Sequence, residues 1–123
     1  MPTASIAPSP ALSAFTHVAA DLIGVTADAL RDVSALGGLL IAAAGAAGYG
    51  TIGAPVVKQL PGGDVAGVLL LDGCHIALHS FPERELLLLD ILAPASRDAR
   101  KALDVFSKRL VPRQIRSEAR PRG

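Results

Sequence analysis

The sequence has no tryptophan, only one tyrosine and three phenylalanines, and a single cysteine among its 123 residues. Because aromatic side chains are so scarce, a buried core has to be built mainly from Leu, Val, Ile and Ala. Because Cys74 has no second cysteine to pair with, an intramolecular disulfide is excluded, and the cysteine content does not point to secretion. A chain of this length holds one compact domain and not two.

Charge is missing from two stretches that bear on cellular location. Residues 1–14 contain no Lys or Arg before their apolar positions and are broken by Pro8 and Pro10, so they predict a flexible arm and not a signal peptide. Residues 33–57 also lack charge, but they are rich in Gly and Ala and contain Pro55. A membrane-spanning helix needs about 20 strongly apolar residues, so a buried helix followed by a strand explains this run better. We expect a cytoplasmic protein without a membrane segment.

The net charge is only +1, so no overall field draws the protein toward nucleic acid or a membrane surface. The basic residues gather at the C-terminus, where residues 111–123 hold one acidic residue and four arginines, Arg113, Arg116, Arg120 and Arg122. Without aromatic side chains between them, such arginines are more typical of a solvated, disordered end than of a nucleic-acid-binding element. We expect a basic C-terminal tail and no nucleic-acid partner.

The apolar periodicity predicts an α+β fold with one domain over residues 15–110. Alternating or continuous apolar runs indicate strands at 15–25, 51–60, 65–71, 75–79 and 86–92. Helical spacing of apolar residues indicates one long helix from about 26 to 47 and a second one capped by Ser96. The short turns between the middle strands favour a mainly antiparallel sheet with both helices on one face. A second copy of the chain is the simplest cover for the other face, so we expect a homodimer.

Reactive side chains crowd together in the segment 72-DGCHIALHSFPE-83, which leaves several interpretations open. Cys74 can be a small buried apolar residue, as free cysteines commonly are. Cys74, His75 and His79 are competent zinc ligands, but alternation along a strand points the cysteine away from both histidines, so we expect no metal site. A cysteine nucleophile with a histidine base is a third interpretation.

The same segment resembles the signature of the prokaryotic S-adenosylmethionine decarboxylases. The stretches CHIALHSFPE and LLLLDILAP match the order and spacing of that family at six positions, His75, His79, Phe81, Pro82, Glu83 and Asp90. The resemblance extends outward through His17 and Asp21 to the final helix. It implies the sandwich fold of that family and the decarboxylation of a small-molecule substrate, S-adenosylmethionine, for spermidine and other polyamine synthesis.

The resemblance also implies a self-made cofactor. The chain would break between Gly73 and Cys74, and Cys74 would become a pyruvoyl group at the new N-terminus, which does the work of pyridoxal phosphate. His79 matches the histidine that assists this processing in the family, and His75 is implied to be a further catalytic residue.

The remaining residues implied for the substrate site are Phe81 and Glu83. Three positions depart from the family pattern: Cys74 replaces the processing serine, Ala66 replaces a serine that assists processing, and Pro94 replaces a proton-donating cysteine. A thiol can replace the hydroxyl at position 74, but Pro94 has no proton to give. Two alternatives follow: a non-catalytic homologue with a regulatory role, and a decarboxylase of arginine or ornithine on the same scaffold.

Overall fold

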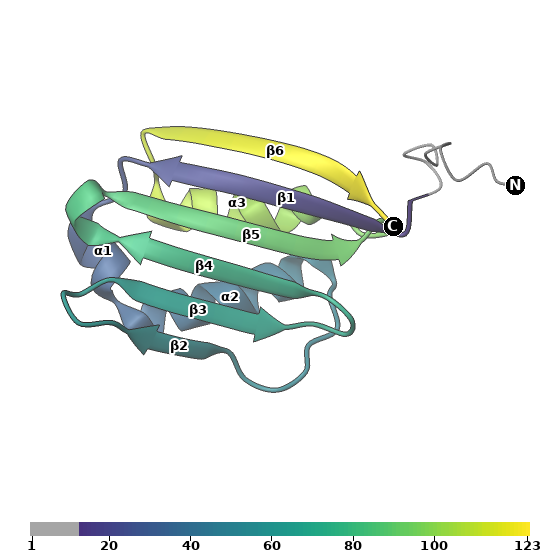
Figure 1. The fold of residues 1–123 in the computed structure, drawn as a ribbon, viewed down its shortest axis with the longest axis horizontal. Helices are drawn as coiled ribbons and strands as arrows, with labels where there is room; N and C mark the ends of the chain where they lie inside the picture. The colour runs from purple at the N-terminus through teal and green to yellow at the C-terminus, as the bar shows by residue number, and fades with distance from the viewer. Residues whose placement is uncertain (1–12) are drawn as a thin grey trace, which may run out of the picture.

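The computed structural model describes residues 13–123, which form a single sheet with helices packed behind one of its faces (Figure 1). All the strand pairings are antiparallel, and the six strands lie in the order β2-β3-β4-β5-β1-β6. The strands are β1 (Phe15–Ile23), β2 (Val56–Gln59), β3 (Val65–Leu70), β4 (His75–Phe81), β5 (Leu86–Pro94) and β6 (Gln114–Arg122). The helices are α1 (Ala27–Arg31), α2 (Val33–Ala47), the 3-10 turn η2 (Pro82–Arg84) and α3 (Ala99–Leu110).

The predicted fold class is therefore confirmed, with an antiparallel sheet and the long helices α2 and α3 on the same side of it (Figure 1). The arm predicted at residues 1–14 lies almost entirely outside the described residues. Within the described residues, no helix has both the length and the apolar character needed to cross a membrane.

The single helix predicted at 26–47 is divided in two at Asp32. Asp32 has extended backbone angles, and its carboxylate accepts a hydrogen bond from the N–H of Ala35 at 3.0 Å, which caps the start of α2. An aspartate satisfies the free N–H groups of a helix start better than it fits a helix interior, so the chain turns there. The last helix is likewise capped by Asp98 and not by the predicted Ser96.

The prediction of a disordered C-terminal tail is wrong. Residues 114–122 form β6, which pairs with β1 from Gln114 opposite Ile23 to Arg122 opposite Phe15. Every residue of β6 is exposed, so the strand carries no apolar pattern that a sequence could reveal. Its backbone hydrogen bonds to β1 hold it, and Arg116 lies opposite Asp21, a favourable cross-strand pairing of charges.

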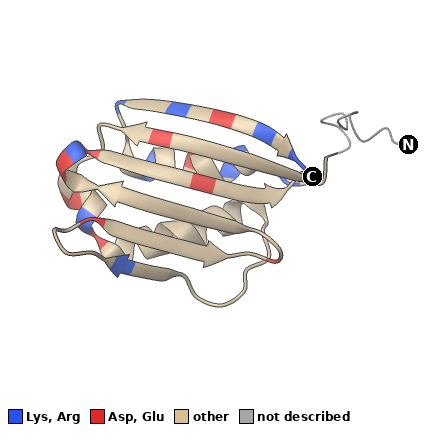
Figure 2. Ribbon diagram, viewed as in Figure 1, with Lys and Arg blue, Asp and Glu red and all other residues tan. Residues whose placement is uncertain are grey.

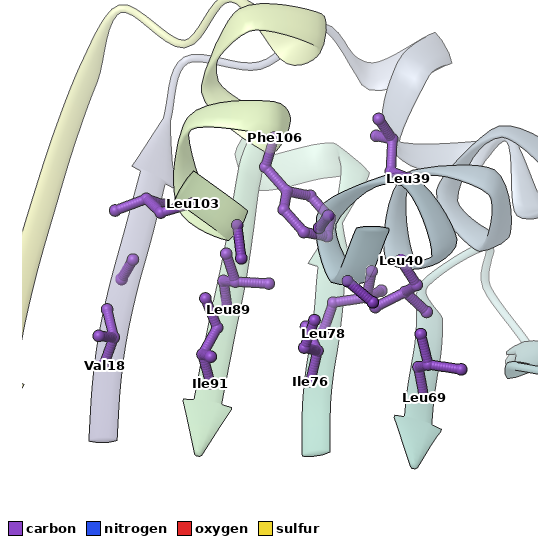
Figure 3. Close-up of a cluster of buried hydrophobic side chains, with 14 of the residues drawn as sticks. Val18, Leu39, Leu40, Leu69, Ile76, Leu78, Leu89, Ile91, Leu103 and Phe106 are labelled. Carbon is purple, nitrogen blue, oxygen red and sulfur yellow. The ribbon is translucent and has the colours of Figure 1, made fainter. Parts of the chain in front are cut away.

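The core lies between the sheet and the helix layer (Figure 3). Leu39 and Leu40 of α2, with Leu103 and Phe106 of α3, face a layer of strand residues that includes Val18, Leu69, Ile76, Leu78, Leu89 and Ile91. Along β4 the buried residues alternate with half-buried or exposed ones, which follows from the two-residue repeat of a strand. The helix side of β4 therefore carries Ile76, Leu78 and Ser80, and the opposite side, called the open face below, carries His75, Ala77 and His79.

No described element covers the open face. Figure 2 shows that β3 and β4 carry no Lys, Arg, Asp or Glu, whereas β6 is strongly charged. The open face of β3 presents the apolar or small residues Ala66, Val68 and Leu70, and Leu70 is 55% exposed. An uncharged central surface with exposed leucine side chains is typical of a face that meets a partner.

Candidate active site

Gly73 and Cys74 lie in the tight turn that joins β3 to β4. The N–H of Leu71 donates to the carbonyl of Cys74 at 2.9 Å, and the N–H of Cys74 donates back to the carbonyl of Leu71 at 3.3 Å. Gly73 has φ +79°, a conformation that strains other residues, and a Cβ there would meet nothing within 4 Å. The predicted cleavage bond is thus in a constrained turn whose glycine has open space around it.

The thiol of Cys74 is largely buried, with 7% of the residue exposed. Its burial and, to a smaller extent, the negative charge of Asp72 raise the pKa of the Cys74 thiol above its ordinary value. Both effects disfavour the thiolate, which is the nucleophilic form. Cys74 is therefore held mainly as a neutral thiol at neutral pH.

Replacing Asp72 with asparagine is expected to lower the pKa of the Cys74 thiol, because it removes the second of these two causes and leaves burial in place. The pH midpoint for alkylation of the thiol by iodoacetamide should move to lower pH. Asp64→Asn, at the other end of β3, is the matched control and should leave the midpoint where it is. An unchanged or higher midpoint for Asp72→Asn would contradict the assignment of the charge effect.

Three residues from three strands meet on the open face. Nε2 of His17 lies 2.5 Å from Oδ1 of Asp90, and Nε2 of His75 lies 3.1 Å from Oδ2 of the same carboxylate. Asp90 stands opposite Ala19 on β1 and Ala77 on β4, and these small neighbours leave room for both imidazoles to reach it.

The charge of the Asp90 carboxylate determines which nitrogen of each imidazole is bonded. Partial burial raises the pKa of Asp90, but the hydrogen bonds and charges of His17 and His75 outweigh it, so the pKa of Asp90 is below its ordinary value. Asp90 is therefore ionised at neutral pH and holds Nε2 of each ring. The Nδ1 atom of His75, the residue next to Cys74, is the ring nitrogen that this carboxylate leaves unbonded.

The predicted site residues do not all come together in one chain. His79 is five residues beyond Cys74 on β4, about 16 Å at the usual rise per residue, and it faces the open side while Cys74 is in the core. Ala66 stands opposite His79. Phe81 ends β4 and Glu83 lies in η2, further still from Cys74.

Pro94, in contrast, lies at the Cys74 end of the sheet. His75 is paired with Leu92, so Pro94, two residues further along β5, reaches the level of the turn. We call Gly73, Cys74, His75 and Pro94 the turn cluster, and Ala66, His79, Phe81 and Glu83 the far cluster. The turn cluster and the far cluster occupy opposite ends of β4.

A cavity of about 260 Å³ borders the turn cluster and is lined by Gly48, Tyr49, Gly50, Leu71, Asp72, Pro94, Ser96 and Arg97. The sequence did not indicate Tyr49 or Arg97 as site residues, and the only signal for Tyr49 was its being the single tyrosine of the chain. A second hollow of about 390 Å³ lies on the open face, where Lys58 and His79 are among its lining residues. Within residues 13–123, no group of three or more His, Cys, Asp or Glu side chains is arranged to hold a metal ion.

Comparison with known proteins gives a consistent result. The model of the S-adenosylmethionine decarboxylase family matches residues 16–123. The chain is 31% identical over 108 residues to the S-adenosylmethionine decarboxylase proenzyme of Persephonella marina, an alignment that covers 87% of this chain and 80% of that protein. It is 32% identical over 108 residues to the proenzyme of the same name from Aquifex aeolicus, with coverages of 87% and 79%.

A solved structure shows the same fold. The crystal structure of the adenosylmethionine decarboxylase from Aquifex aeolicus superposes with a TM-score of 0.82 at 31% sequence identity, over 90% of this chain and 92% of that one. The family match extends to the last residue and so includes β6. The resemblance read from the segment at 72–83 is confirmed, and the chain belongs to the S-adenosylmethionine decarboxylase family of enzymes.

Proposed function

We propose that this protein is a self-processing, pyruvoyl-dependent decarboxylase that acts on S-adenosylmethionine in the cytoplasm and supplies spermidine synthesis. The observation that carries the proposal is the position of the Gly73–Cys74 bond, in a tight turn beside His75 and its partner Asp90. Two relatives named S-adenosylmethionine decarboxylase proenzyme support both the substrate and the processing.

Self-processing begins as Sγ of Cys74 attacks the carbonyl carbon of Gly73. The new C–S bond replaces the C–N bond, and the thiol proton passes to the freed nitrogen, which gives a thioester. A base then removes the Cα proton of Cys74, and the C–S bond to Cβ breaks, leaving a thiocarboxylate on Gly73 and a dehydroalanine. Addition of water to the tautomeric imine releases ammonia and leaves a ketone. A thiol attacks more readily than the hydroxyl it replaces, once it is deprotonated.

Cys74 fits as the precursor of this group, since it carries a sulfur leaving group on Cβ and follows a glycine in a bend. When formed, the pyruvoyl group supplies a carbonyl that binds the substrate amine and accepts the electron pair released with CO₂. Asp72 and Arg97 in the adjoining cavity offer charges of both signs to a substrate of the amino-acid type.

The proposed catalytic unit is a homodimer formed through the open faces. Cys74 and His79 are too far apart in one chain for His79 to remove the Cα proton. The two sheets face each other, and the two-fold axis lies in the plane between them, perpendicular to the strands. This axis reverses the strand direction, so the turn cluster of one chain lies against the far cluster of the other. The second copy then contributes its His79 as base, with Phe81 and Glu83 to bind the cationic substrate.

Intact-mass spectrometry of the purified protein tests the proposal. The wild-type chain is expected to give two fragments, residues 1–73 and residues 74–123. The first should end in a thiocarboxylate or, after hydrolysis, in a carboxylate, and the second should lack the sulfur and nitrogen of Cys74. Cys74→Ala, which removes the nucleophile, should remain one chain. A wild-type chain that stays unbroken, with its thiol still titratable, would refute the proposal.

The substrate is tested separately on the cleaved protein. CO₂ release should be fastest from S-adenosylmethionine and slower from arginine or ornithine, the substrates of the alternative enzymes. A faster reaction with either amino acid would leave the proposed self-processing intact and would show that S-adenosylmethionine is not the preferred substrate.

Pro94 and Ala66 favour a second candidate, a non-catalytic homologue that binds a partner. Pro94 has neither a side-chain proton nor a backbone N–H to donate, and the methyl group of Ala66, opposite His79, cannot form a hydrogen bond. This candidate predicts an uncleaved chain in the same mass measurement.

A further inference from the structure

The hydroxyl group of Tyr49 is buried and has no hydrogen-bond partner anywhere in residues 13–123. The residue as a whole is only 8% exposed. Buried hydroxyl groups are nearly always paired, because an unpaired one loses its hydrogen bonds to water and gains nothing in return. Phenylalanine would fill the same space without this loss, so packing does not account for the hydroxyl.

Tyr49 lies beside the turn that holds the Gly73–Cys74 bond. Its backbone N–H donates to the carbonyl of Ala44 at 2.9 Å, and the next residue, Gly50, accepts a hydrogen bond from the N–H of Asp72 at 2.9 Å. Tyr49 and Cys74 belong to the same buried cluster. The chain at 49–50 is thus tied directly to the residue that precedes Gly73.

Tyr49 is suited to donate a hydrogen bond and not to release a proton. Burial, followed by the negative charges of Asp98 and of a Cys74 thiolate, raises the pKa of Tyr49 to about 12. The phenol therefore stays protonated over the whole pH range in which the thiol reacts. A protonated donor without a partner is free to bond to an oxygen that becomes negative later.

We propose that the Tyr49 hydroxyl donates its hydrogen bond to the carbonyl oxygen of Gly73 while the peptide bond rearranges to the thioester. As Sγ of Cys74 bonds to the carbonyl carbon, that oxygen takes up the negative charge, and it returns to a carbonyl when the C–N bond breaks. Tyr49 keeps its proton throughout and only stabilises the charge. Because the bond is missing in the resting chain, its whole effect falls on the transition state. This inference rests on the proposed self-processing.

Tyr49→Phe removes only the hydroxyl and tests the inference. Losing one donor to a developing oxyanion typically slows a reaction by about 10²–10³, and a slowing of this size is expected for self-cleavage followed by mass spectrometry. In the Cys74→Ala background, which keeps the chain uncleaved, Tyr49→Phe should leave the unfolding temperature the same or raise it, since an unpaired buried group is gone. Hydroxylamine, which splits thioesters, should release fragment 1–73 more slowly from the variant, which assigns the effect to the first step.

Ser80→Ala is the matched control. The Ser80 hydroxyl is also buried but donates to the carbonyl of Leu30 at 2.7 Å, at the end of the molecule where α1 lies, opposite the β3–β4 turn (Figure 1). This variant should unfold at a lower temperature and cleave at the wild-type rate. A merely structural Tyr49 would behave like Ser80, with lost stability and unchanged cleavage.

The outcomes separate the inference from the function on which it rests. Cleavage of the wild-type chain and slow cleavage of a stable Tyr49→Phe chain support the inference. Equal cleavage rates overturn it and leave the proposed function intact. If wild-type protein does not cleave and hydroxylamine releases no fragment, the proposed function fails and the inference falls with it.

Discussion

Co-expression of the His79→Ala and Cys74→Ala chains is expected to restore fast self-cleavage, which is absent from Cys74→Ala alone and slow in His79→Ala alone. Cys74→Ala has no nucleophile, and His79→Ala lacks the base, whose loss should slow cleavage by about 10²–10⁴. In a mixed dimer, the turn cluster of the His79→Ala chain, with Cys74 intact, lies against the far cluster of the other chain, with His79 intact. With random pairing, about half of the His79→Ala chains are in such dimers and should cleave.

The control uses a chain that carries both substitutions. Co-expressed with His79→Ala, this double variant can form the same mixed dimers, but no site then contains His79, so cleavage should stay as slow as in His79→Ala alone. Differently tagged chains purified in two steps show that the mixed dimers exist. If they exist and the His79→Ala chain cleaves no faster in the first mixture than alone, the composite site is wrong. Cleavage of His79→Ala alone at the wild-type rate would remove His79 from the mechanism.

The alternation of residues along β4 was readable in the sequence because it depends on the two-residue repeat alone. It correctly placed Cys74 and His75 on different sides of the sheet. The family resemblance identified the candidate site residues between Cys74 and Glu83, because these residues form one continuous segment of the chain. Neither the alternation nor the family resemblance revealed that the turn cluster and the far cluster are separated within one chain. Residues that are close in the sequence motif are far apart in space when the chain between them is an extended strand.

Contacts between distant parts of the chain were beyond the sequence for a physical reason. The meeting of His17 with Asp90 depends on the register of β1 against β5, which is set by the packing of the whole sheet. β6 was missed because its edge position gives it no buried side and hence no apolar pattern. Tyr49 looked like one more residue at the end of an apolar helix, and only the tertiary structure brings it to the β3–β4 turn.

Replacing Pro94 with cysteine is expected to raise the rate of decarboxylation per cleaved chain by about 10²–10⁴, the usual effect of a positioned general acid. After CO₂ leaves, the substrate carbon needs a proton, and in the wild-type chain water or one of the histidines His75 and His79 has to supply it, because proline has none to give. The register of β5 against β4 brings position 94 to the level of the β3–β4 turn. A cysteine thiol there remains mostly protonated at neutral pH and can donate.

The backbone at this position tolerates the change. Pro94 is paired with Phe15 at the end of β5, and the next residue, Ala95, donates its N–H to the carbonyl of Ala14 at 2.9 Å, so the strand end is held without the proline ring. Pro94→Ala separates the loss of the ring from the gain of the thiol, and it should remain as slow as wild type. The rate is measured as CO₂ released from saturating S-adenosylmethionine, divided by the cleaved fraction from mass spectrometry. If Pro94→Cys is no faster than Pro94→Ala on this scale, position 94 does not face the reacting carbon, and the proton comes from another source.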